Sequence, residues 1–182
     1  IVGDFVGNYA SVGSAIYNQA VGANSEANIK SITGYFVGNY SYSEYAWGAI
    51  FNQSVTGSGA KATIGDITAD FIGNYALATS GEQHGGAITN RSQVTNSVVN
   101  TGNIKGDFIG NYISSSSGYT FGGAIGNVTI SSGSTITMGD ITGDFIENRI
   151  SAGSGTLNVG GAIGNYSYGA NSVITLGDIT GS

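Results

Sequence analysis

Residues 106–112 read GDFIGNY, and close copies of this heptapeptide recur along the chain. The copies are GDFVGNY at 3–9, GYFVGNY at 34–40, ADFIGNY at 69–75 and GDFIENR at 143–149. Successive Phe residues of these copies are 31 to 37 residues apart. A fixed period of this length is typical of solenoids, propellers and other repeat arrays.

A second motif alternates with the first. Its copies are SAIYN at 14–18, GAIFN at 48–52, GGAITN at 85–90, and GGAIGN at 122–127 and 160–165. Both motifs end in an aliphatic residue, one spacer and an Asn. The repeat is therefore compound, and its approximate limits are 1–31, 32–66, 67–103, 104–140 and 141–182. We expect residues 1–182 to form one segment of a longer array.

The residues between the glycines favour β-structure. Val, Ile, Thr and Tyr dominate, and apolar residues alternate in stretches such as TITMGDI at 135–141. The alternating runs are too short for propeller blades and fit the short faces of a coil. The sequence thus predicts an all-β, parallel, right-handed β-helix, in which each residue stacks about 4.8 Å above its counterpart. Two interior ladders are expected, Phe5, Phe36, Phe71, Phe108 and Phe145 in one, and Ile16, Ile50, Ile88, Ile125 and Ile163 in the other.

The spacing of the motif Asn residues is compatible with two different numbers of coils per repeat. Successive motif Asn residues are about 17 residues apart on average, which predicts two coils per 31–38-residue repeat, with both motifs stacked on one face. Ten such coils make a rod of about 45 to 50 Å. The gap of 10 residues between Asn8 and Asn18 is too short to circle a core. It favours the alternative that the motifs lie on different faces of one larger coil.

Composition excludes several functional classes. The 182 residues include 32 Gly but no Pro or Cys, so neither collagen nor a disulfide scaffold fits. Five basic residues stand against eleven acidic ones, which is the opposite of the charge balance of a nucleic-acid-binding protein. No apolar run reaches the length of a membrane span, and no basic-then-apolar start marks a signal peptide. If the protein is exported, its signal is expected outside this stretch.

The two motifs resemble a known family. FVGN at 5–8, FIGN at 71–74 and complete GGAI tetrapeptides at 85–88, 122–125 and 160–163 are similar to the FxxN and GGA[ILV] repeats of chlamydial polymorphic outer membrane proteins. The first two copies of the second motif depart from it, as GSAI and WGAI. The resemblance implies a β-helical passenger, displayed at the cell surface by an autotransporter barrel outside this chain and used for adhesion.

Few side chains are candidates for chemistry. His84, the single histidine, is expected in an exposed loop, and no catalytic residue is predicted. Repeated acidic residues around GDIT could line up oxygens for calcium, although turn aspartates that bond their own backbone explain them better. These residues are Asp66, Asp70, Asp140 and Asp144. No cofactor is otherwise expected.

Tyrosines and threonines are the remaining repeated features. Tyr42, Tyr45 and Trp47 lie in a less repetitive stretch and are predicted to contact a partner, because exposed Tyr and Trp are common in recognition surfaces. Tyr residues that follow motif Asn residues are equally well explained as a ladder at the coil edge. These are Tyr9, Tyr40, Tyr75, Tyr112 and Tyr166.

The predicted function is a non-enzymatic stalk, adhesin or fibre segment of a secreted or surface-displayed bacterial protein. Expected partners are a protein or glycan on a host or neighbouring cell, and further copies joined end to end, but neither nucleic acid nor a membrane entered by this segment. Two alternatives remain open: an ice-binding solenoid, suggested by repeated threonines such as Thr33 and Thr68, and a non-catalytic part of a polysaccharide-active β-helix.

Overall fold

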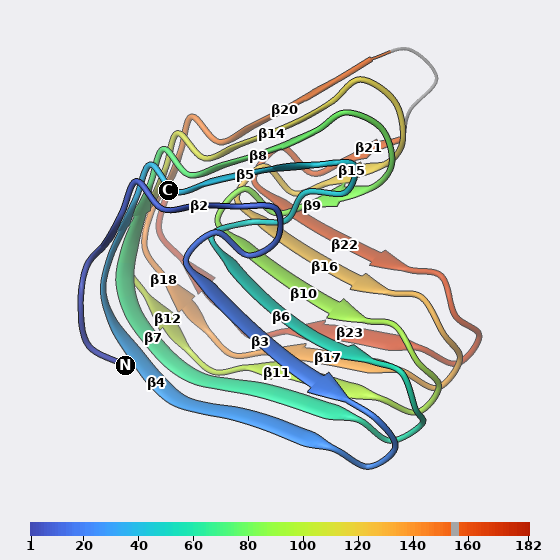
Figure 1. The fold of residues 1–182 in the computed structure, drawn as a ribbon. Helices are drawn as coiled ribbons and strands as arrows, with labels where there is room; N and C mark the ends of the chain where they lie inside the picture. The colour runs from blue at the N-terminus through green and yellow to red at the C-terminus, as the bar shows by residue number, and fades with distance from the viewer. Residues whose placement is uncertain (154–156) are drawn as a thin grey trace.

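The computed structural model describes residues 1–153 and 157–182, and it forms a parallel β-solenoid (Figure 1). The described residues form strands and no helix, which confirms the predicted all-β class. No helix in this part of the chain is long and apolar enough to cross a membrane.

Four parallel sheets, here named A to D, run along the solenoid axis. Sheet A contains β1 (Phe5–Val6), β4 (Glu26–Val37), β7 (Lys61–Ile72), β11 (Val98–Thr101), β12 (Ile104–Lys105), β13 (Phe108–Ile109), β17 (Thr135–Met138), β18 (Ile141–Thr142), β19 (Phe145–Ile146), β23 (Val173–Leu176) and β24 (Ile179–Thr180). Sheet B contains β2 (Tyr9–Ala10), β5 (Tyr40–Ser43), β8 (Tyr75–Ala78), β14 (Tyr112–Ser115) and β20 (Arg149–Ala152). Sheet C contains β3 (Ile16–Val21), β6 (Ile50–Val55), β10 (Ile88–Ser92), β16 (Ile125–Thr129) and β22 (Ile163–Ser167). Sheet D contains β9 (Gln83–His84), β15 (Thr120–Phe121) and β21 (Asn158–Val159).

Each repeat makes one coil. Phe36 pairs with Phe71 and Phe71 with Phe108 in sheet A, whereas Ile88 pairs with Ile50 and Ile125 in sheet C. The two motifs therefore lie on different sheets of the same coil, and the prediction of two coils per repeat is wrong. The Phe ladder has five members, so the stack rises by only about 20 Å at 4.8 Å per step. The predicted rod of 45 to 50 Å is also wrong, for the same reason.

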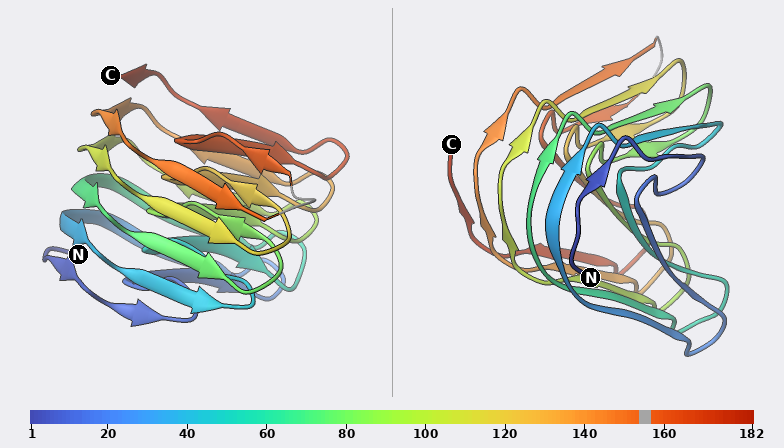
Figure 2. Two further views of the ribbon diagram at one scale, coloured as in Figure 1. Left: turned by 90° about the horizontal axis from the view of Figure 1, so that it is seen from above. Right: turned by 60° about the vertical axis from the view of Figure 1, so that its left-hand side comes forward.

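The cross-section has a body and an arm. Sheets A and C enclose the body, whose core consists of the Phe and Ile ladders with Ala49, Ala87 and Ala124 between them. Sheet B projects from the body and sheet D returns to it, so that the two form an arm (Figures 1 and 2). A small cluster around Ala46, Ala76 and Ile113 fills the arm.

The arm explains the uneven spacing of the motifs. It is the segment between the two motif Asn residues of a coil, which are 10, 13, 16, 16 and 17 residues apart from the first coil to the fifth. The first coil has no strand in sheet D, and the second contributes only an isolated bridge between Trp47 and His84. A short first arm, and not a failure to circle the core, is the cause of the 10-residue gap.

Stacking of identical side chains holds the coils in register. Phe71 lies between Phe36 and Phe108 with ring centroids 4.9 and 4.8 Å away, and the rings are nearly parallel. Asn74 donates from Nδ2 to Oδ1 of Asn111 at 3.0 Å and to the carbonyl of Phe36 at 2.8 Å. The same bonds recur from Asn8 to Asn148, so the Asn of the first motif bonds both the backbone and the next Asn at a corner. A second Asn ladder joins the coils at sheet C, from Asn18 to Asn165 through Asn52, Asn90 and Asn127.

One corner position requires the left-handed backbone conformation. Gly38, Gly73 and Gly110 have φ of 60°, 60° and 61° there. Glu147 takes the same place in the last copy, GDFIENR, with φ of 55°. A Cβ at any of these glycines meets no atom within 4 Å, so the cost of Glu147 is conformational and not steric.

Candidate binding groove

Two of the three predicted contact residues are well exposed. Tyr42 and Tyr45 are 41% and 44% exposed, whereas Trp47 is half-buried. Trp47 lies at the inner corner between the arm and the outer face of sheet C. Its ring stacks on Phe51 at 4.8 Å, and Tyr45 stacks on Trp47 at 6.3 Å. Tyr42 and Tyr45 are therefore accessible at the surface, whereas Trp47 forms part of the wall of a corner.

This corner continues along the axis, and we call it the groove. One wall is formed by sheet D and the residues before it, and the other by the outward-facing residues of sheet C. Two cavities border the arm, and only the second has sheet C residues in its lining. The first, of about 250 Å³, is lined by Ser11, Val12, Ser43, Glu44, Tyr45 and Trp47. The second, of about 180 Å³, is lined by Glu82, Phe121, Val128, Ile130, Tyr166 and Tyr168.

His84 lies in the groove between these cavities, which corrects the expectation of an exposed loop histidine. The side chain is fully buried in β9, paired with Phe121 of the next coil and bridged to Trp47 of the preceding one. Its imidazole contacts the Phe121 ring edge-on at 5.1 Å. The local sequence SGEQH is polar and suggests a loop, but stacking in sheet D overrides it.

Burial and a nearby carboxylate set the electrostatics of the groove. Burial lowers the pKa of His84, so the imidazole is neutral at pH 7, and neither ring nitrogen has a hydrogen-bond partner within 3.5 Å. The Glu82 carboxylate is 3.7 Å from Nε2 of His84 and is one-third exposed. Interaction with His84, opposed in part by burial, lowers the pKa of Glu82 and keeps it ionised.

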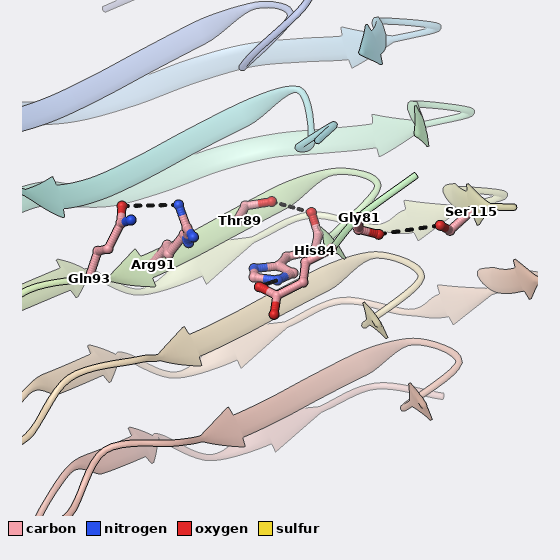
Figure 3. Close-up of polar contacts among 7 residues, drawn as sticks. Gly81, His84, Thr89, Arg91, Gln93 and Ser115 are labelled. Atoms are coloured by element: carbon pink, nitrogen blue, oxygen red, sulfur yellow. Dashed lines mark hydrogen bonds and ion pairs between the residues drawn. The ribbon is translucent and has the colours of Figure 1, made fainter. Parts of the chain in front are cut away.

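Arg91 supplies the positive charge of the groove. Its guanidinium lies 5.7 Å from the centre of the Trp47 ring and donates to Oε1 of Gln93 at 3.1 Å. Figure 3 shows Arg91, Thr89 and His84 along one coil, with Thr89 bonded to the carbonyl of His84. Burial lowers the pKa of Arg91, but a guanidinium still stays charged at neutral pH. The groove thus joins an ionised acid, a guanidinium and flat rings.

The four aspartates proposed as calcium ligands have a structural role. Asp66 and Asp140 are separated by Asn103, and each Oδ1 of this row accepts a backbone N–H of the next coil at 2.8 to 2.9 Å. Asp70 and Asp144 do the same in a parallel row through Asp107. The carboxylates therefore bond the neighbouring coil and not their own backbone. Among the described residues, no three His, Cys, Asp or Glu side chains are grouped to hold a metal ion.

The other repeated residues also stack. Tyr40 lies between Tyr9 and Tyr75 with ring centroids 5.3 and 4.2 Å away, so these tyrosines form a ladder on sheet B. Tyr166 is not part of it, because it pairs with Val128 in sheet C. The exposed threonine row that includes Thr68 and Thr142 is interrupted by Lys105 between them.

Sequence reasoning missed Glu82, Arg91, Phe121 and Tyr168, and it left Tyr166 open between a ladder and a contact role. The available signal was position relative to the motifs: Arg91 and Tyr166 each follow the Asn of the second motif, where Gln53 and Val128 stand in other coils. Variation at a fixed place in a repeat marks residues that stacking does not require to be identical.

The fold and this groove define the protein as a parallel β-solenoid with an aromatic corner. Comparisons with protein-family models, with curated proteins and with solved structures found no match to the chain.

Proposed function

We propose that this solenoid is a non-enzymatic adhesive segment of a secreted or surface-displayed bacterial protein. The observation that supports it most is the contrast between uniform ladders and the groove, where exposed aromatic residues differ from coil to coil. Exposed Tyr beside half-buried Trp and Arg are the residue types enriched at recognition hot spots. The FxxN and GGA[ILV] motifs, which occupy equivalent places in every coil, favour the resemblance to autotransporter passengers.

The mechanism is geometric. Hydrogen bonds between coils make a stiff body, and the arm presents the exposed rings of Tyr42 and Tyr45. A partner on another cell, protein or glycan, contacts this edge without any covalent step.

Adhesion of coated beads tests this function. Beads carrying the 182-residue chain are expected to bind host or bacterial cells more than albumin-coated beads do. The double variant Tyr42→Ser and Tyr45→Ser is expected to remove most of that binding. Tyr35→Ser is the matched control, because Tyr35 is 52% exposed on sheet A, away from the arm. Treating the cells with protease or with glycosidases separates a protein partner from a glycan. Binding that is equal to albumin, or unchanged in the double variant, contradicts the proposal.

A further inference from the structure

The second cavity of the groove has walls of a distinct kind. Tyr166 and Tyr168 meet at 71° with centroids 5.2 Å apart, so their two rings form a corner. Phe121 stacks on Tyr166 at 4.7 Å and supports that wall from the arm. Tyr168 is 57% exposed, which leaves the cavity open to ligand on its side.

A carboxylate completes the cavity. Glu82 lines it together with these rings. Aliphatic Val128 and Ile130 line the remaining side. The cavity therefore presents ring faces and one acidic group, and no basic side chain lines it.

The charge of Glu82 is only partly compensated by its neighbours. His84, its nearest ionisable contact, is buried and uncharged at pH 7. Arg91 attracts it from the same coil, but the guanidinium is directed to the ring of Trp47 on the other side of His84.

We propose that this cavity binds an alkylammonium group, such as the trimethylammonium of choline. Aromatic faces attract cations through the ring quadrupole, and cages of aromatic rings are the usual sites for quaternary ammonium groups. An apolar cavity of about 150 Å³ accommodates a benzene molecule, so about 180 Å³ is sufficient for a trimethylammonium head. The Glu82 carboxylate distinguishes such a cation from a neutral group of the same shape.

Titration with choline and with its neutral isostere 3,3-dimethyl-1-butanol tests the proposal. Both are added to the full chain at low ionic strength, and binding is followed by NMR shifts. Choline is expected to saturate with a dissociation constant in the millimolar range, and the isostere to bind about tenfold more weakly. The absence of saturable binding at 50 mM choline, or equal affinity for the two probes, overturns the proposal.

Two variants assign the binding to this cavity. Glu82→Gln is expected to weaken choline about tenfold and leave the isostere unchanged. Tyr168→Leu retains apolar area but removes the ring, and it is expected to weaken choline at least threefold. Tyr17→Leu is the control, because Tyr17 is also exposed on sheet C but stacks on Phe51 near the other cavity. Unchanged choline affinity in both cavity variants, with folding verified by circular dichroism, overturns the assignment.

Two further ligands in the same titration identify the kind of molecule that carries the ammonium group. Phosphocholine represents a lipid or glycan headgroup, and a peptide with trimethyllysine represents a protein. Tighter binding of one than of choline identifies the natural carrier. If neither binds as well as choline itself, the cage does not serve an attached ligand and the proposal fails for macromolecular partners.

Discussion

The Phe71 corner and the His84 groove are built on the same stacking geometry but tolerate different residues. At the corner, Phe71 is sandwiched between two identical rings in the interior. In the groove, the position of His84 is taken by Trp47 in the preceding coil and by Phe121 in the next. An interior ring touches neighbours on every side, so only the same shape fits. His84 and Phe121 are buried as well, yet this position holds Trp, His and Phe in successive coils, so its packing accommodates rings of different shape.

Truncation of the interior ladder is the strongest test of this difference. Phe71→Ala is expected to lower the free energy of unfolding by about 3 to 5 kcal/mol, because it leaves a cavity between two fully buried rings. Tyr17→Ala in the groove, where the ring is 46% exposed, is expected to cost less than about 1 kcal/mol. Urea denaturation measures both. Similar losses for the two variants would mean that the interior and the groove do not differ in packing.

Removal of one ladder amide is the next test. Asn74→Ala removes the amide that donates to Phe36 and Asn111, and with it the Oδ1 that accepts two bonds from the buried Asn39. The expected loss is about 3 kcal/mol, again from urea denaturation. Asn28→Ala is the control, since Asn28 bonds only the exposed Glu26 through its side chain, and its effect is expected within about 0.5 kcal/mol. A loss below about 1 kcal/mol for Asn74→Ala would show that the ladder is not required.

Replacing His84 with the residue at the same position of the next coil, Phe121, is expected to increase the stability of the protein. His84→Phe replaces a buried imidazole that has no hydrogen-bond partner with the ring present in the next coil, and about 1 to 2 kcal/mol of added stability is expected. A destabilised variant would indicate that the interaction with Glu82 outweighs the burial of the imidazole.

The same substitution alters the pH dependence of stability. The pKa of His84 is lowered by folding, so below about pH 6.5 the unfolded chain binds a proton that the folded chain does not. The free energy of unfolding of the wild type is therefore unaffected by His84 protonation above that pH, and it decreases as the pH drops below it. His84→Phe is expected to remove this decline between about pH 6.5 and 5. The lowered pKa of Glu82 acts only at lower pH, near and below its ordinary value of 4.5. Urea midpoints across this range give the comparison.

The smallest expected effect concerns the left-handed corner. Glu147→Gly is expected to stabilise the chain by about 1 kcal/mol, because glycine adopts φ of 55° without strain. Gly110→Ala, at the equivalent corner, is expected to lose a similar amount, since only its φ and no neighbouring atom opposes a Cβ. Thermal unfolding detects both. Changes of the same sign would contradict a conformational origin.

Much of the fold follows from the repeats. The all-β class, the two apolar ladders and the Asn ladder at the corner were predictable, because stacking demands identical residues at equal positions. The number of coils per repeat was predicted wrongly as two, although the 10-residue gap favoured the alternative of one larger coil. Both motifs end in an aliphatic residue, a spacer and Asn, so their likeness suggested stacking of one on the other. In the structure each motif stacks on its own copies. Both corners use an Asn because its side-chain amide donates to the Asn of the next coil.

The candidate site was predicted only in part. Tyr42, Tyr45 and Trp47 stood out as aromatic residues in a less repetitive stretch. Glu82 and Tyr168 are 86 residues apart in the chain, and nothing in their local sequence joins them. They meet because Glu82 lies on the arm of one coil and Tyr168 follows β22 of another.

The sequence by itself determined which residues stack, since repetition at a fixed period records the constraint that each coil places on the next. Tertiary structure alone decided how far the chain travels per coil and where it turns back as an arm. That turn depends on the packing of Ala46, Ala76 and Ile113 between sheets B and D. It buries His84 and brings Glu82 against the rings of Tyr166 and Tyr168, because side chains on two different sheets face the same corner.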